Sequence, residues 1–409
     1  MTRTIYMRRP ARKRRRRLLG ILIFVLSLAL LASLPGAFSV RAGAASSEEE
    51  AAMQELNENI HELLDSLDTE ELQNYLDSLS QFRGASVKDR IAGLITGDFS
   101  LDYGSLGEAV LAIVWEEGQV MLPAFAVILA VALLCGILNS AKNGFLHSTM
   151  SDVIHFVGYV SVGSVVLACL ISVLQAGFST ITSMQRQMEL VYPLLLTLMA
   201  GSGGAVSVGI YRPAVAFMSG AICELFTDVV LPTSVVVIVL AFVGNLSEDV
   251  RTEKLGDLFK SISKWLIGLT LGLFSLFLTV QGIASAQYDG LSLRAVKYVV
   301  SGSVPVVGGF LSGGIDLVIA GSALIKNALG SFAVFMLFGT LLRPVLLFAA
   351  FQLFLRLAAA ATEPVGGKIS SFLSRLATDM GYFLAALLCI AFLYLLTLIL
   401  LICSSGVIF

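Results

Sequence analysis

Long apolar stretches dominate the chain after residue 119. A helix needs about 20 apolar residues to cross the hydrocarbon of a bilayer, so four stretches predict membrane-spanning helices: 120–141, 153–175, 265–286 and 381–403. A shorter run at 232–246 needs turns from its flanks to span. The stretches 190–231 and 296–361 are broken by glycine, proline and charge, so their number of helices stays open. The pattern predicts an all-α, polytopic helical membrane protein.

A different pattern precedes these stretches, because apolar residues recur there at steps of three and four. Ser47 and Glu50 form a capping-box pattern before the first such helix, and Asp68 with Glu71 starts a second one. Shorter helices are expected at 86–96 and 105–117. One interpretation is a small helical cap folded on itself. The other is a docking stripe for a partner, made of Leu56, Ile60, Leu63 and Leu67.

The charge pattern places this helical region outside the cytoplasm. Nine of the 27 Lys and Arg residues lie between Arg3 and Arg17, directly before an apolar segment, as in a secretory signal. We predict a signal sequence at 1–44, with Ala42 and Ala44 before the cleavage site; an uncleaved anchor is the alternative. The segment 45–117 has 17 acidic and three basic residues, which suits an exported domain at 45–119.

Similar landmarks recur in the apolar part at nearly constant spacing. Leu122-Pro123 matches Leu231-Pro232, and Ser202-Gly203-Gly204 matches Ser312-Gly313-Gly314. We therefore expect two degenerate repeats, 120–231 and 232–361, before a loop and C-terminal helix at 362–409. The basic loop 248–264 then lies in the cytoplasm and the repeats are parallel. The Arg212-Pro213 and Arg343-Pro344 pairs do not fit this topology cleanly.

The composition and motifs mainly exclude classes of function. The chain has 409 residues, 56% hydrophobic and 14% charged, with formal net charge −2 and mean hydropathy +0.87, so lipid is part of its solvent. The five cysteines lie in apolar stretches and the three histidines are not clustered, so no disulfide framework, metal site or cofactor is expected. The chain lacks phosphate-loop, serine-hydrolase and zinc-protease motifs. We expect no enzyme and no nucleic-acid partner.

Candidate functional residues are charges and glycines at membrane depth. Glu224 and Asp228 lie one turn apart in an otherwise apolar segment, where charge is costly and tends to face water or protein; Asp316 has a similar setting. Arg212 or Arg343 could pair with them. The runs containing Gly203, Gly204, Gly313 and Gly314 predict either unwound backbone at a substrate pathway or close helix packing.

The order of these features resembles the stage III sporulation protein AE family of endospore-forming bacteria. The resemblance covers nearly the whole chain: the basic signal, Leu67-Asp68 and Leu72, residues 86–89 and 94–97, Tyr192-Pro193, Ser202-Gly203-Gly204 and Arg212-Pro213. No single motif is diagnostic.

This resemblance implies a non-enzymatic subunit of a channel or secretion-like complex between the mother cell and the forespore. Its partners would be other membrane and ring-forming subunits and a separate ATPase. The exported domain would then face the forespore from the mother-cell membrane. The alternative is a stand-alone secondary transporter that uses broken helices and Glu224.

Overall fold

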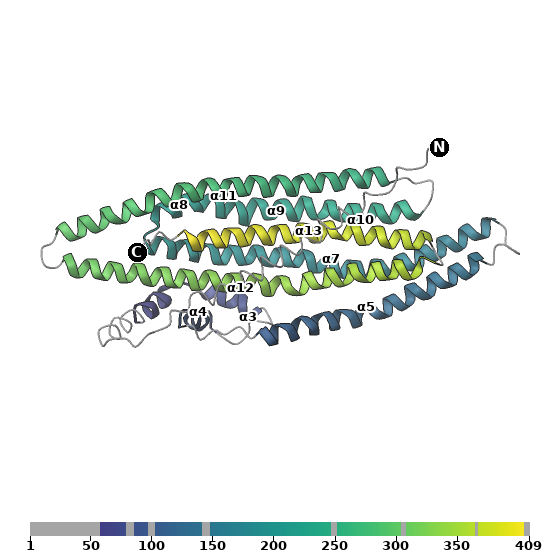
Figure 1. Cartoon of the computed structure of the whole chain (residues 1–409), viewed down its shortest axis with the longest axis horizontal. Coiled ribbons are helices and arrows are strands. Elements are labelled where there is room, and N and C mark those ends of the chain that lie inside the picture. Colours follow the sequence, from purple (N-terminus) through teal and green to yellow (C-terminus); the bar gives the residue numbers. More distant parts are fainter. Residues whose placement is uncertain are drawn as a thin grey trace, which may run out of the picture. The chain divides into compact units, whose positions relative to one another are not determined.

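The computed structural model describes residues 58–78, 86–96, 103–140, 148–246, 252–303, 308–364 and 367–404. All of them belong to one compact unit, Leu56–Phe409. Every regular element within these ranges is a helix (Figure 1). The predicted signal sequence and Leu56 lie outside the described residues.

Three short helices form the cap: helix 58–66, α3 (Glu70–Ser78) and α4 (Val87–Thr96). Their apolar stripe is buried, as the residue spacing predicts; Ile60, Leu64, Leu72 and Leu76 are almost inaccessible. The cap folds on itself, since the Val87 amide donates to Gln73 Oε1 at 2.7 Å. It also packs on the long helices, with α4 against α12 and α3 against α7.

The long helices run side by side and are joined by short connections (Figure 1). α12 packs along α13, α7 and α5, and α10 packs against α11 and α13. Their bounds are α5 (Tyr103–Ser140), α7 (Ser148–Gly201), α8 (Ala205–Phe217), α9 (Cys223–Leu225), α10 (Leu231–Leu246), α11 (Glu253–Ser303), α12 (Gly308–Thr362) and α13 (Gly367–Cys403). Two π-helical segments, η2 (Met218–Ile222) and η3 (Phe226–Val230), flank α9 and keep the run from α8 to α10 continuous.

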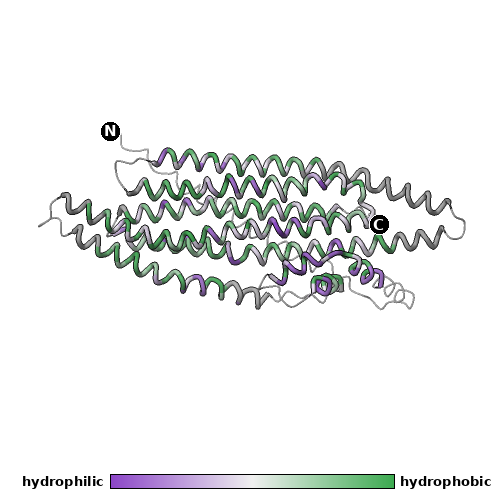
Figure 2. The backbone as a smooth tube through the Cα atoms, turned by 180° about the vertical axis from the view of Figure 1, so that it is seen from behind, coloured by the Kyte–Doolittle hydropathy of each residue, from purple (hydrophilic) through white to green (hydrophobic). Residues whose placement is uncertain are grey.

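Five helical segments of the described chain are long and apolar enough to cross a membrane: Leu111–Leu134, Phe156–Gly201, Ala205–Gly244, Leu317–Thr362 and Ile369–Cys403. Hydrophobic residues follow the long helices, whereas the short helices of the cap are richer in hydrophilic ones (Figure 2). This all-helical architecture is consistent with a polytopic membrane protein. The span expected at 265–286 lies within α11 and stays a prediction.

Several of these helices are much longer than a bilayer requires. α7 has 54 residues and α12 has 55, which at 1.5 Å per residue gives about 80 Å, against about 30 Å of hydrocarbon. Lipid can therefore cover only part of each helix. Part of the remaining length carries the cap, where Leu63 lies beside Gly321 of α12 and Tyr75 bonds to Ser183 of α7.

One element differs from the sequence expectation. The expected helix 105–117 and span 120–141 form a single helix, α5, because Gly118 stands alone as a breaker and Pro123 is accommodated within the helix. The run 232–246 continues the helix from α8, which supplies the flanking turns expected for it; the repeat boundary at 231/232 stays a prediction. Of the two alternatives for the stretch containing Gly313 and Gly314, unwound backbone is not observed, since both glycines lie within α12.

Candidate functional site

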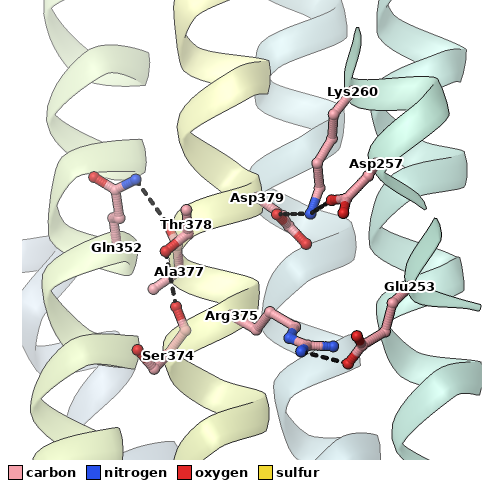
Figure 3. Close-up of polar contacts among 9 residues, drawn as sticks. All are labelled: Glu253, Asp257, Lys260, Gln352, Ser374, Arg375, Ala377, Thr378 and Asp379. Carbon is pink, nitrogen blue, oxygen red and sulfur yellow. Dashed lines mark hydrogen bonds and ion pairs between the residues drawn. The ribbon is translucent and has the colours of Figure 1, made fainter. Parts of the chain in front are cut away.

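A network of five charged residues joins α11 to α13. Lys260 of α11 and Asp379 of α13 form an ion pair, with Nζ to Oδ1 at 2.8 Å, and Arg375 pairs with Glu253 at 2.6 Å (Figure 3). Asp257 lies 3.8 Å from Lys260. We call these residues the Asp379 network.

The pair at its centre is shielded from solvent. The Asp379 side chain is 1% exposed and that of Lys260 is 18% exposed, whereas Asp257 and Glu253 reach the surface. Both carboxylate oxygens of Asp379 are shielded from solvent, and Lys260 is the cation that faces them. A cavity of about 120 Å³ is lined by Asp379, by Thr252 and Gly244, and by the other charged members of the network.

Local sequence explains how the network is positioned. Thr252 precedes α11 and accepts the Gly256 amide through its carbonyl, so the helix begins there and presents Glu253, Asp257 and Lys260 on one face. The Thr252 hydroxyl donates to Leu240 of α10 at 2.8 Å. Gly244 permits this approach, because a Cβ at that position would overlap Thr252 Oγ1.

A second set of charges lies on the outside of the bundle. Arg212, Glu224 and Asp228 are exposed, and none makes an ion pair or hydrogen bond within the part of the chain that the structure describes. Gly209 precedes Arg212 by three residues and Gly220 precedes Glu224 by four, and a Cβ at either glycine would meet nothing within 4 Å. We call these five residues the outer charged face. It includes η2 and α9 and ends in η3, and π segments are often found at functional sites.

The structure does not bring together the charges that the sequence suggested as partners. Arg343 pairs with Glu117 of α5 at 3.2 Å and lies 3.6 Å from Glu116, not with Glu224. Arg212 is separated from Glu224 by three helical turns. Asp316 lies in α12 with Gly313 and Gly314.

The Gly203 region has the geometry of a helix end. Gly203 has φ 87°, and the Gly204 amide donates to the Met199 carbonyl at 2.9 Å, which closes the last turn of α7. Only glycine adopts this backbone conformation without strain. The backbone amides at this helix end are therefore satisfied by carbonyls of α7, and the chain turns at Gly203 into α8.

The proposed docking stripe is partly covered within this chain: Ile60 is buried, Leu63 and Leu67 are half-buried, and Leu56 lies outside the described residues. Ile60 is 4% exposed, and Leu63 lies against Gly321 of α12. Nearby, the Tyr75 hydroxyl donates to the Ser183 carbonyl and accepts from Gln187, which also donates to Thr340 at 2.6 Å. Burial is the main cause that raises the pKa of Tyr75 above its ordinary value of 10. The cap is thus attached by both apolar and polar contacts.

The sequence analysis did not identify two buried charged residues, Asp379 and Lys326. Asp379 lies two residues before the expected span 381–403, so a slightly longer apolar window would have included it. Its partner Lys260 was expected only as a charge of the basic loop. Lys326 is fully buried in α12 and donates to the Leu401 and Ile402 carbonyls at the end of α13. Its position between Ile325 and Asn327 in a long apolar stretch was the available signal.

The described residues hold no group of three or more His, Cys, Asp or Glu side chains placed to share a metal ion. The described part of the chain is an all-helical bundle with a helical cap and a buried ion pair, which is consistent with a polytopic membrane protein.

Comparison with known proteins gives the family. Residues 85–406 match the family model described as stage III sporulation protein AE, so the chain belongs to that family. It is 26% identical over 346 residues to stage III sporulation protein AE of Bacillus subtilis (strain 168), covering 83% of this chain and 87% of that protein. No solved structure gives a significant match.

Proposed function

We propose that this protein is a non-enzymatic membrane subunit of a multi-protein sporulation channel, a secretion-like complex between mother cell and forespore. Its membrane and ring-forming partners, together with a separate ATPase, complete the assembly. The family assignment supports a role in sporulation, and the outer charged face supports assembly with other membrane proteins.

The position of Glu224 and Asp228 carries this proposal. The apolar segment Ala205–Gly244 has 40 residues, and about 20 are needed to cross the hydrocarbon. Any 20-residue window within this segment contains Glu224, Asp228 or both. A charged group facing lipid near the bilayer centre costs about 2.5–3.5 kcal/mol on insertion scales. Another protein that covers this face removes that cost.

The charges also indicate the kind of partner. A second copy of this chain, related by an axis along the membrane normal, would place Glu224 opposite Glu224 and Asp228 opposite Asp228. Like charges repel, so we propose a different membrane protein whose helix carries Lys or Arg at that level. Gly209 and Gly220 allow the backbone of such a helix to approach closely.

The test compares two substitutions of one residue in a sporulating host that depends on this chain. We expect Glu224→Gln to impair sporulation at unchanged membrane abundance and Glu224→Leu to do so at least as severely, with loss of co-purifying membrane subunits. Glu189→Gln is the matched control, since this exposed acid lies outside the face and pairs with Arg186. A fully functional Glu224→Leu variant with normal co-purification rejects the docking role.

A stand-alone secondary transporter is the second candidate, favoured by the buried Asp379 beside a cavity. Such a protein should drive ion-coupled uptake when reconstituted alone in liposomes, whereas a complex subunit should not. Uptake by the purified chain would favour this candidate.

A further inference from the structure

Arg212 adds a positive charge to the outer charged face, about 18 Å along the helix from Glu224 at about 1.5 Å per residue. Its side chain is exposed within the apolar segment Ala205–Gly244, and no described residue pairs with it. A cation in such a segment is costly unless water, a lipid phosphate or an acidic side chain meets it. The face therefore presents charges of both signs at a fixed separation.

The π-helical segment η2 brings Arg212 and Glu224 closer to one side of the helix. In an unbroken α-helix, residues about 12 positions apart point about 120° away from each other, because each residue turns the chain by about 100°. η2 (Met218–Ile222) lies between them, and its wider turns reduce this divergence. Both side chains are exposed, and so is Asp228, one turn after Glu224. One neighbouring helix can therefore contact all of these charges.

We propose that the outer charged face binds a transmembrane helix of another protein that carries one acidic and one basic residue about 12 positions apart, a spacing that matches the rise between Arg212 and Glu224. The acid lies level with Arg212. The base, best an Arg, lies between Glu224 and Asp228, whose carboxylates can share its guanidinium. This inference rests on the proposed docking function and adds the second charge that the partner must carry.

A second copy of this chain does not fit these charges within one membrane. A copy in the same orientation places Arg212 opposite Arg212, and like charges repel. A copy in the opposite orientation would place Arg212 opposite Glu224, but its basic N-terminal run would then lie on the other side of the membrane. The positive-inside rule disfavours such opposite insertion. The occupant is therefore a different protein.

The test measures binding of designed transmembrane peptides to the full chain in lipid nanodiscs. The peptides are helices of about 22 Leu and Ala residues. They carry Asp and Arg about 12 positions apart, Asp and Arg about five positions apart, or Arg alone, and a fluorophore reports binding. Reconstitution inserts peptides in both directions, so the order of Asp and Arg does not matter. We expect the first peptide to bind about tenfold more tightly than either of the others.

A charge reversal in the chain should reverse this preference. Arg212→Glu should bind a peptide with two Arg residues about 12 positions apart in preference to the matching Asp–Arg peptide. Arg356→Glu is the matched control, because Arg356 is an exposed arginine of another apolar segment, Leu317–Thr362, and it should behave like the parent. If Arg212→Glu does not insert, Arg212→Gln should bind the Asp–Arg and Arg-only peptides equally.

Equal binding of the Asp–Arg and Arg-only peptides by the parent overturns the inference, since Arg212 then meets water or lipid phosphate. Impaired sporulation of Glu224→Leu would still support docking through the acids alone, whereas a fully functional Glu224→Leu variant rejects the docking function itself. Self-association of the parent that Arg212→Glu abolishes would assign the face to a second copy and also overturn the inference.

Discussion

The Asp379 network and the outer charged face both place acidic residues in apolar helices, yet they treat charge in opposite ways. In the network, Asp379 is buried and paired with Lys260 of another helix at 2.8 Å. On the outer face, Glu224 and Asp228 are exposed and make no ion pair with any described residue. Asp379 thus faces a cation inside the bundle, whereas Glu224 and Asp228 face its surroundings.

The difference separates intramolecular stability from assembly. A buried ion pair that loses one member leaves an uncompensated charge, so the folded chain itself is destabilised. An outward carboxylate contributes little to the fold of the isolated chain but requires a partner or water within the membrane. Substitutions at the two places should therefore change different measurements.

The largest effect is expected for Asp379→Ala. Lys260 then loses its buried counter-charge, and we expect a loss of about 3–5 kcal/mol in the free energy of unfolding, the usual consequence of breaking a buried pair from one side. Titration of the purified chain with sodium dodecyl sulfate measures this loss.

The double variant Asp379→Leu with Lys260→Met removes both charges at once. It should recover most of the lost stability, because neither charge is left unpaired. A double variant as unstable as Asp379→Ala would show that the pair has little part in the effect.

A second contrast concerns glycines inside the bundle. Gly177 lies under Phe383 and Phe348, and a Cβ there would overlap the Phe383 ring. Gly177→Ala should therefore lower the free energy of unfolding by about 1–3 kcal/mol through overpacking. The same titration measures it, and Gly163→Ala is the matched control, since a Cβ there makes ordinary contact with Phe242 at 3.5 Å.

Glycines of the outer charged face should respond in the opposite direction. Gly209→Ala adds a methyl group to open space in α8, so the isolated chain should gain about 0.5–1 kcal/mol from higher helix propensity. Gly209→Leu should keep the chain abundant yet weaken co-purification, because bulk prevents close approach of a second helix. Unchanged co-purification with the Leu variant would argue against a partner at this glycine.

The sequence predicted elements better than pairings. Apolar length and three- to four-residue spacing were sufficient for the cap, with Ile60 and Leu72 buried, and for the helical membrane architecture, because these depend on local periodicity. The pairing of Asp379 with Lys260 could not be predicted from the sequence, because the two residues are more than a hundred positions apart and meet only through the packing of α11 on α13.

The local sequence pattern also did not predict which side chains face outward or where the helices end. The sequence placed Glu224 in an apolar segment but not on its outside, because η2 and η3 alter the helical register on either side of it. Similar glycine runs gave different outcomes. Gly203 ends α7 with a positive φ, whereas Gly313 lies within α12. Glycine content alone therefore does not tell a helix end from helix interior.

The smallest effect is expected at a third location, where an acid faces water. Asp65 of the cap pairs with Lys88 at 2.9 Å, with 80% of the Asp65 side chain and 33% of the Lys88 side chain exposed. The hydrogen bond from Lys88 is the main cause that lowers the pKa of Asp65 below 3.8. A carboxyl whose pKa is lowered on folding stabilises the fold above its unfolded-state pKa, and this contribution disappears as pH falls through the folded-state pKa.

We expect Asp65→Asn to leave the unfolding midpoint at pH 7 nearly unchanged, since solvent screens exposed pairs. Any difference from the parent should shrink as pH falls below 3.8, vanish below the folded-state pKa, and shrink with added salt. A loss as large as that of Asp379→Ala, persisting in high salt, would break the comparison, because burial would then no longer separate strong from weak charge pairs in this chain.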